Sequence, residues 1–275
     1  MSYPFCVQTK SKILMIGIDG LLLQRAIDSG RARTLSFLRR DSYFCEMLVD
    51  MPTVSGPSWS TILTGVTQDI HRVIDNDFVD HNLAEAPDLL TQASQNFSGI
   101  STFAAAGWPP LIDPNDVGPV IAVRKKDIEQ GTHSIFVRDG ETHGYESVDR
   151  EVASAALAAI QESAPDLSFV YFCGADEAGH QTGTLKGGYF DAIERIDLLV
   201  EQLHHEISER SKKFQERWLI VITTDHGHRD EGGHGGDSAQ ERASFLIAHG
   251  VGMAHPSWPA KIKPEDIVGH LLATL

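Results

Sequence analysis

Acidic and histidine side chains gather at a few points of this 275-residue chain, with spacings suited to metal binding. One pair, Asp176 and His180, is four residues apart, and a second pair, Asp225 and His226, is adjacent. Carboxylate oxygens and imidazole nitrogens suit Zn²⁺ best, with Mn²⁺ or Fe as alternatives. The candidate ligands are Asp19, Asp176, His180, Asp225, His226, His228 and His234. Taken singly, each of these residues more often caps a helix, forms a surface pair or lies in a solvated loop. Taken together, they offer enough ligands for two ions.

A serine that could act as a nucleophile lies in the segment 51–65, whose sequence is MPTVSGPSWSTILTG. Pro57 and the small residues before it predict a turn that opens into a helix. Ser55 would then lie at the helix N-terminus, where free backbone N–H groups attract an anion. Next to a divalent cation, a serine hydroxyl can ionise and attack phosphorus. Alone, Ser55 would be interpreted as a helix N-cap; beside the candidate ligands it becomes a candidate nucleophile.

Apolar runs of strand length end just before three of the candidate ligand positions. The runs cover residues 13–18, 167–173 and 218–223, and a fourth covers 243–248. Such runs are typical of strands buried on both faces, and helical patterns over 148–163 and 189–207 separate them. Ligands of open α/β sheets bind beyond the carboxyl ends of the strands, so the candidate ligands should converge at one edge. The predicted fold is a three-layer α/β/α sandwich with a mostly parallel central sheet.

Residues 107–147 are the least regular part of the chain and begin with a stretch rich in Pro and Gly, GWPPLIDPNDVGP. We expect them to form a small insertion over the sheet edge, within a single domain that covers residues 1–275. Trp108, in this stretch, is a weak candidate for contact with the leaving group of a substrate.

The charge balance limits the partners of the protein. With 23 basic and 38 acidic residues, its formal net charge is −15, which argues against a nucleic-acid polymer or an anionic membrane surface as partner. A small anionic substrate stays compatible, because metal ions can reverse the local field. The first apolar run is too short to cross a bilayer, and residues 1–12 lack the apolar core of a signal peptide. Three widely spaced cysteines do not suggest disulfides, so a cytoplasmic location is expected.

The order of these motifs resembles the type I phosphodiesterase/nucleotide pyrophosphatase family, a branch of the alkaline phosphatase superfamily. The matching motifs are Asp19, residues 52–57 (PTVSGP), Thr64-Gly65, residues 71–76 (HRVIDN), Asp176 with His180, Asp225-His226-Gly227 and His234-Gly235. They extend over nearly the whole chain. The resemblance implies an alkaline-phosphatase-like core that hydrolyses phosphate esters with two divalent cations, zinc first.

The resemblance also implies a role for each matching residue. The first cation would be bound by Asp176, His180 and His234. The second cation would be bound by Asp19, Asp225, His226 and Ser55. Ser55 would attack phosphorus to form a phospho-serine, which water then hydrolyses, while Asn76 would donate a hydrogen bond to a phosphate oxygen. Ser58 replaces an Asn that is usual in the family and is a weak candidate for substrate binding. Because His234 follows His226 unusually closely, His228 stays an alternative to His234 as a ligand.

Three other functions stay open. The same metal core serves phosphomonoesterases and phosphonate hydrolases, and the chain could also be a metal-binding homologue without catalysis. A monoesterase usually adds a charged clamp for the extra phosphate oxygens, and the sequence assigns no Arg or Lys to that role. The preferred prediction is therefore a phosphodiesterase or nucleotide pyrophosphatase that acts on a small phosphate ester.

Overall fold

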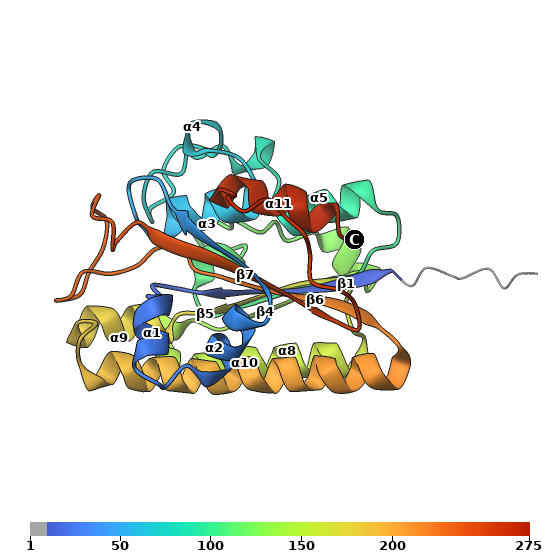
Figure 1. Ribbon diagram of the computed structural model, residues 1–275. Helices are drawn as coiled ribbons and strands as arrows, with labels where there is room; N and C mark the ends of the chain where they lie inside the picture. The colour runs from blue at the N-terminus through green and yellow to red at the C-terminus, as the bar shows by residue number, and fades with distance from the viewer. Residues whose placement is uncertain (1–9) are drawn as a thin grey trace, which may run out of the picture.

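One central sheet forms the middle of the structure, a computed structural model that describes residues 10–275 (Figure 1). Its strands are β1 (Ser11–Ile18), β2 (Tyr43–Leu48), β3 (Thr102–Ala106), β4 (His133–Val137), β5 (Leu167–Phe172), β6 (Arg217–Thr223) and β7 (Ala243–Val251). The strand order is β2-β7-β6-β1-β5-β3-β4. Neighbouring strands pair in parallel except at β7, which is antiparallel to both β6 and β2. The prediction of a mostly parallel sheet is confirmed.

Each face of the sheet carries its own apolar core, because successive side chains of a strand point to opposite faces. In β1, Ile13 and Met15 belong to one core, while Leu14, Ile16 and Ile18 belong to the other. All five side chains are fully buried. Burial on both faces explains why the strand reads as a continuous apolar run in the sequence.

Helices cover both faces of the sheet (Figure 1). On the first core pack α3 (Ser55–Thr64), α5 (Leu89–Asn96) and α11 (Ile267–Leu272). On the second core pack α1 (Leu23–Asp28), α2 (Arg33–Arg40), α8 (Tyr145–Glu162), α9 (Gly174–Thr182) and α10 (Gly187–Phe214). A short helix, α4 (Gln68–His71), and 3₁₀ turns at Leu83–Glu85 and Pro264–Asp266 complete the outer layer. The predicted three-layer α/β/α sandwich is confirmed.

Residues 107–147 extend the sheet rather than forming a separate cap. They contain a 3₁₀ turn (Pro109–Leu111), α6 (Lys125–Glu129), the edge strand β4 and α7 (Gly140–His143). Strand β4 pairs with β3 along its full length, from His133 opposite Thr102 to Val137 opposite Ala106. The segment therefore shares the core of the main sheet. Residues 1–9, which the predicted domain includes, lie outside the described part of the chain.

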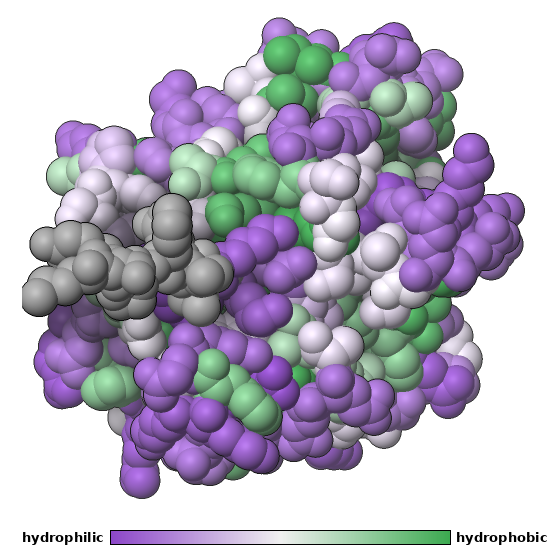
Figure 2. Space-filling view, turned by 90° about the vertical axis from the view of Figure 1, so that its right-hand side faces the viewer, coloured by the Kyte–Doolittle hydropathy of each residue, from purple (hydrophilic) through white to green (hydrophobic). Residues whose placement is uncertain are grey.

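The parallel strands begin on one side of the molecule and end on the other (Figure 1). Figure 2 shows the side on which β1 begins, where hydrophilic residues predominate and apolar residues are interspersed. The carboxyl ends of the parallel strands lie on the opposite side, at the left of Figure 1. Among residues 10–275, every helix is too short or too polar to cross a bilayer.

Candidate metal centre

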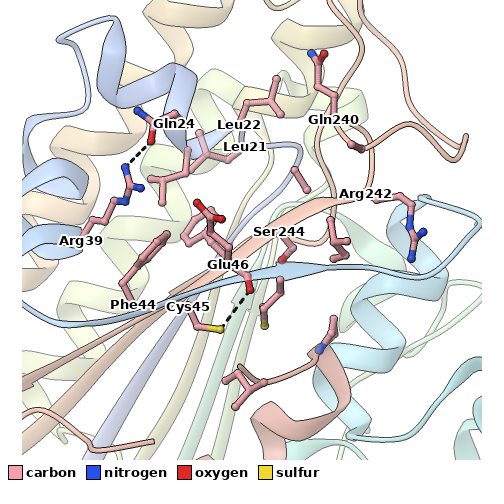
Figure 3. A pocket seen from close by; sticks show the side chains of 18 of the residues that line it. Leu21, Leu22, Gln24, Arg39, Phe44, Cys45, Glu46, Gln240, Arg242 and Ser244 are labelled. Carbon is pink, nitrogen blue, oxygen red and sulfur yellow. Dashed lines mark hydrogen bonds between the residues drawn. The ribbon is translucent and has the colours of Figure 1, made fainter. Parts of the chain in front are cut away.

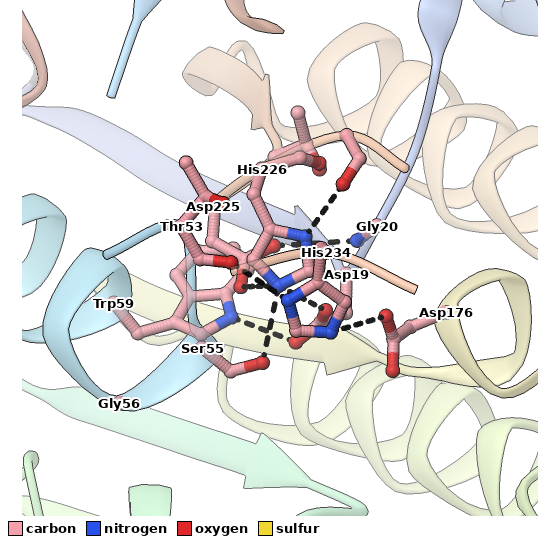
Figure 4. A network of polar contacts seen from close by, with 12 residues as sticks. Asp19, Gly20, Thr53, Ser55, Gly56, Trp59, Asp176, Asp225, His226 and His234 are labelled. Atoms are coloured by element: carbon pink, nitrogen blue, oxygen red, sulfur yellow. Dashed lines mark hydrogen bonds and ion pairs between the residues drawn. The ribbon is translucent and has the colours of Figure 1, made fainter. Parts of the chain in front are cut away.

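Three neighbouring strands end at one group of acidic and histidine side chains (Figure 4). Strand β1 leads directly into Asp19, β6 leads through Thr224 into Asp225 and His226, and α9, which follows β5, carries Asp176. Because β1 lies between β5 and β6, the carboxyl ends of these strands place the four side chains close together. The structure thus gathers at one edge the residues that the sequence predicts to converge there.

The first ligand group consists of Asp19, Asp225 and His226, whose ligand atoms all lie within 4.8 Å of one another. All three residues are fully buried. His226 Nε2 lies 3.5 Å from Asp19 Oδ1 and 3.2 Å from Asp225 Oδ2. Within the described residues, neither of these oxygens has a hydrogen-bond partner. His226 Nδ1 can donate to the Gly227 carbonyl at 3.1 Å, which directs the Nε2 lone pair toward the two orphaned oxygens.

The second ligand group consists of Asp176, His180 and His234. His180 Nε2 and His234 Nε2 face each other at 2.9 Å, and each lies 3.5 Å from a carboxylate oxygen of Asp176. His234 Nδ1 can donate to the Thr53 carbonyl at 2.7 Å, so its Nε2 is left with a lone pair. Two imidazole nitrogens and a carboxylate that converge on one point fit a divalent cation such as Zn²⁺.

The electrostatics of the centre also fit cations. Burial, and then the negative charge of Asp176, raises the pKa of Asp19 to about 6. Burial raises the pKa of Asp176 to about 7, and burial together with the two other carboxylates raises the pKa of Asp225 well above its usual range. Burial lowers the pKa of His226 far below its usual range, so the imidazole is neutral. Bound divalent cations would stabilise these carboxyls in their ionised form, and a neutral imidazole has a lone pair with which to bind a cation.

Two aromatic side chains hold Asp19 in place, and the sequence had not indicated this role. Tyr171 Oη donates to Asp19 Oδ2 at 2.6 Å, and Trp59 Nε1 donates to the same oxygen at 3.0 Å. Oδ2 is thus saturated, and Oδ1 is free to bind a cation. Tyr171 stands beside Gly17 in the register of β5 and β1, and the ring of Trp59 occupies the space over that glycine. A tyrosine within a fully buried strand must find a partner for its hydroxyl, which is the signal that could have revealed it.

Thr53 links the nucleophile segment to the loop that carries His234. Its carbonyl accepts from His234 Nδ1, its hydroxyl donates to the Gly236 carbonyl at 2.9 Å, and that hydroxyl oxygen accepts from Gly235 N at 2.9 Å. Thr53 is fully buried. One residue therefore fixes both the orientation of a candidate ligand and the backbone two residues before Ser55.

Ser55 is the first residue of α3, so the helix begins two residues before Pro57, the predicted first helical position, and Ser55 follows Val54 in an extended conformation. Its Oγ lies 3.3 Å from His226 Nε2, which places the hydroxyl at the first ligand group. The side chain is almost fully buried, with 7% exposure. A hydroxyl at a helix N-terminus beside candidate cation ligands is positioned for nucleophilic attack on a bound phosphate.

Asn76 borders the same helix N-terminus. Gly56 N donates to Asn76 Oδ1 at 2.7 Å, which leaves the two N–H groups of the amide available as donors. The approach requires a glycine, because a Cβ on Gly56 would lie 2.6 Å from the Asp75 carbonyl and 2.9 Å from Asn76 Oδ1. Buried His71 braces the preceding turn, because its Nε2 contacts Thr61 Oγ1 at 3.0 Å.

Ser58 and Trp108 lie outside the two ligand groups, whereas His228 lies beside them, because its ring nitrogen forms a third possible ligand group with Asp176 and His226. Ser58 is buried in the first turns of α3, and its hydroxyl has no hydrogen-bond partner among residues 10–275. Trp108 is only 6% exposed and packs in the first core, with its ring 6.2 Å from that of Phe78, so little of it is left to contact a leaving group. His228 is fully buried, and its Nε2 lies 2.7 Å from Asp176 Oδ1.

A large groove lies apart from the ligand groups, between α1 and the strands β2 and β7 (Figure 3). Its volume is about 1670 Å³, and Leu22, Phe44, Glu46 and Arg242 are among its lining residues. None of the candidate ligands lines it, and neither does Ser55 or Asn76. The side chains capable of metal chemistry therefore lie outside this groove.

Comparison with known proteins agrees with this geometry. In sequence, GPI ethanolamine phosphate transferase 2 of Eremothecium gossypii is 26% identical over 199 residues, which is 71% of this chain and 22% of that protein. The chain thus spans about a fifth of the length of this relative. In structure, phosphonoacetate hydrolase from Sinorhizobium meliloti 1021 shares the fold with a TM-score of 0.68 at 12% identity, over 97% of this chain and 96% of that chain.

Murine ectonucleotide pyrophosphatase/phosphodiesterase 5 also shares the fold, with a TM-score of 0.66 at 15% identity, over 96% of this chain and 95% of that chain. The model of one family matches residues 13–241, from the first strand to the loop beyond His234. The family that the order of the motifs resembles is therefore confirmed. The chain belongs to the type I phosphodiesterase/nucleotide pyrophosphatase family.

Proposed function

We propose that this protein hydrolyses small phosphodiesters through a phospho-serine intermediate at a centre that binds two divalent cations. The observation that carries the proposal is the position of Ser55 Oγ, 3.3 Å from His226 Nε2 and at the N-terminus of α3. The same helix end and the amide of Asn76 present N–H donors for phosphate oxygens. The candidate nucleophile, the hydrogen-bond donors for phosphate and the candidate cation ligands thus lie close together.

The proposed cation ligands follow the two groups of the structure. One cation would be held by Asp19, Asp225 and His226 with the Ser55 oxygen, and the other by Asp176, His180 and His234. Mixed carboxylate and imidazole donors favour Zn²⁺, with Mn²⁺ or Fe as alternatives. When bound, such cations would supply Lewis-acid activation of the serine hydroxyl and neutralise charge on the phosphate.

The protein residues then carry out two displacements. In the first, Ser55 Oγ attacks phosphorus, the bond from phosphorus to the leaving oxygen breaks, and the serine proton leaves with the released alcohol. In the second, water attacks the phospho-serine, phosphorus keeps the hydroxyl, and the proton returns to Ser55 Oγ. Asn76 Nδ2 donates to a phosphate oxygen in both steps, where negative charge accumulates.

A diester substrate is favoured over a monoester by the charges around the centre. A monoester carries one more negative oxygen, which usually requires a cationic side chain. Among residues 10–275, no Arg or Lys side chain forms a hydrogen bond or an ion pair with the candidate ligands or with Ser55. Arg72, the nearest in sequence to Asn76, is exposed.

The preference is tested with bis-p-nitrophenyl phosphate and p-nitrophenyl phosphate, which share a leaving group. We expect kcat/KM for the diester to exceed that for the monoester by about tenfold or more, because the centre lacks a cationic clamp. Faster turnover of the monoester would favour a phosphomonoesterase instead. Absence of turnover by the protein loaded with Zn²⁺ or Mn²⁺ would favour a non-catalytic homologue.

A second candidate function is transfer of the phosphoryl group to an alcohol. It is favoured by the sequence relatives, which are named GPI ethanolamine phosphate transferases. The first displacement would be unchanged, and an acceptor hydroxyl would replace water in the second. Product analysis with added glycerol separates the two functions, because a transferase forms a glycerol diester whereas a hydrolase releases p-nitrophenyl phosphate.

Substituting alanine for Gly56 is expected to impair phosphate binding without loss of the cations. The added Cβ would press on the Asp75 carbonyl and on Asn76 Oδ1, so Asn76 would move away from the helix N-terminus. Loss of one such donor lowers kcat by about 10²-fold to 10³-fold. The check is steady-state kinetics on bis-p-nitrophenyl phosphate together with metal analysis. Gly269→Ala in α11, where a Cβ meets open space, is the matched control, and equal kinetics in the two variants would contradict the role of Asn76.

A further inference from the structure

We infer that His228 is a positioning residue that holds the Asp176 carboxylate through a hydrogen bond from its Nε2 and does not itself bind a cation. This inference rests on the proposed function, because it concerns one of the two proposed cation groups. His228 Nε2 lies 2.7 Å from Asp176 Oδ1, whereas His180 and His234 approach Asp176 only to 3.5 Å. The contact with His228 is thus the hydrogen bond that fixes this carboxylate.

Two glycines leave the space that the His228 ring occupies, and each is next in sequence to a proposed ligand. A Cβ on Gly20, which follows Asp19, would lie 2.5 Å from His228 Nε2. A Cβ on Gly179, which precedes His180, would lie 2.9 Å from the same atom. Gly20 also has a positive φ of 63°, a conformation that other residues rarely adopt. A side chain at either glycine would displace the fully buried imidazole.

Hydrogen bonding distinguishes His228 from the histidines proposed as ligands. In His226 and His234, Nδ1 faces a backbone carbonyl, of Gly227 and Thr53, so that Nε2 is left with a lone pair for a cation. His228 has the reverse arrangement, because its Nδ1 has no hydrogen-bond partner among residues 10–275 and its Nε2 faces Asp176. His228 could also form a ligand group with Asp176 and His226. A carboxylate that binds a cation is ionised and can only accept, however, so a hydrogen bond at 2.7 Å requires the proton on His228 Nε2. A protonated Nε2 cannot bind a cation.

The hydrogen bond determines which carboxylate oxygen is free. His228 donates to Asp176 Oδ1, which also lies 3.5 Å from His234 Nε2, and Oδ2, which lies 3.5 Å from His180 Nε2, stays available. Without the hydrogen bond, the carboxylate can rotate, and the cation group of Asp176, His180 and His234 loses its preorganisation. Removal of such a partner typically weakens metal affinity by about 10-fold to 100-fold. The group of Asp19, Asp225 and His226 should keep its affinity.

The test is calorimetric titration of the metal-free protein with Mn²⁺, for the wild type, His228→Met and His228→Gln. We expect two equivalents in each protein, with one of the two weakened by about 10-fold to 100-fold in His228→Met. In His228→Gln, the amide can also donate a hydrogen bond to Asp176, so this variant should keep most of the wild-type affinity for Mn²⁺. His133→Gln is the matched control, because His133 is equally buried but lies in β4, and it should leave both affinities unchanged.

A second measurement needs no substitution. In ¹⁵N-histidine spectra of the Zn²⁺-loaded wild type, His228 should carry a proton on Nε2. Direct binding of Zn²⁺ by His228 Nε2, or two unchanged Mn²⁺ affinities in His228→Met, would overturn the inference while leaving the proposed function intact. If the wild type binds no cation, the proposed function itself fails, and the inference falls with it.

Discussion

Replacing Ser55 by alanine is expected to lower kcat/KM for bis-p-nitrophenyl phosphate by about 10⁴-fold or more, while the protein stays folded and binds its cations. The reason is chemical, because alanine has no oxygen to attack phosphorus and no phospho-serine can form. The residual rate would come from the cations and from the N–H groups that donate hydrogen bonds to phosphate at the helix N-terminus. Stopped or continuous assays of p-nitrophenol release, with metal content measured on the same samples, check the result.

The neighbouring serines provide matched controls for this variant. Ser60 lies on the same helix, is fully buried and has no hydrogen-bond partner for its hydroxyl among the described residues, so Ser60→Ala should keep near wild-type kinetics. Ser55→Thr retains an alcohol at the same position and should retain turnover. Wild-type activity in Ser55→Ala with cations bound would refute the phospho-serine pathway.

Removal of the cations is expected to destabilise the protein, and more strongly at about pH 8 than at about pH 5. The folded-state pKa values of Asp19 and Asp176 are raised to about 6 and 7, and that of Asp225 is raised further. For acids with raised pKa values, the stabilising contribution of the protonated form is present below the unfolded pKa and is lost as pH rises through the folded pKa. These three carboxyls therefore lower the stability of the metal-free protein between about pH 4 and pH 7, whereas the histidines of the centre, whose pKa values are lowered by burial, contribute in the opposite direction.

Cations reverse this loss, because they bind the ionised carboxylates of the folded protein only. At a free concentration of about 1,000 Kd, each site adds about 4 kcal/mol, and two sites together raise Tm by about 15–30 °C in a domain of this size. Calorimetric scans with chelator, with Zn²⁺ and with Mn²⁺ at the two pH values measure the effect.

The control for this effect is Asp225→Asn, which removes one buried charge of the centre. It should raise Tm of the metal-free protein at about pH 8, because the repulsion between carboxylates falls, and should abolish part of the gain from cations. The absence of any gain in Tm from either cation at about pH 8 would contradict the proposed centre.

Sequence patterns identified the strands that form continuous runs of large apolar residues and missed the strands that do not. The apolar runs at 13–18, 167–173, 218–223 and 243–248 correspond to β1, β5, β6 and β7. Strand β3, TFAAA, escaped prediction because three of its five residues are alanines, which are depleted in strands, and because its pairing depends on its neighbours β5 and β4. Strand β2 is an edge strand with exposed Glu46 and Leu48, so its pattern lacks a continuous apolar run.

The sequence predicted those site residues that are acids or histidines near the end of an apolar, strand-length run. Asp19 directly follows an apolar run and Asp225 follows another after one residue, and an acid at the end of an apolar run is conspicuous in a sequence. The contacts of Tyr171, Trp59 and Thr53 depend on segments that meet only in the folded chain, so spacing alone could not reveal them. The role of His228 is of the same kind, since its partner Asp176 lies 52 residues earlier.

The central position of β1 has a consequence for the order in which the protein can acquire its cations. Strand β1 is made first, yet both of its partners, β5 and β6, begin more than 150 residues later, at Leu167 and Arg217. At a synthesis rate of about 5–20 residues per second, Asp19 waits about 10–40 s for Asp225 and His226 to be made. The candidate ligand groups can therefore form only after residues 225–234 are made, and loading of the proposed cations should follow that point rather than the synthesis of β1.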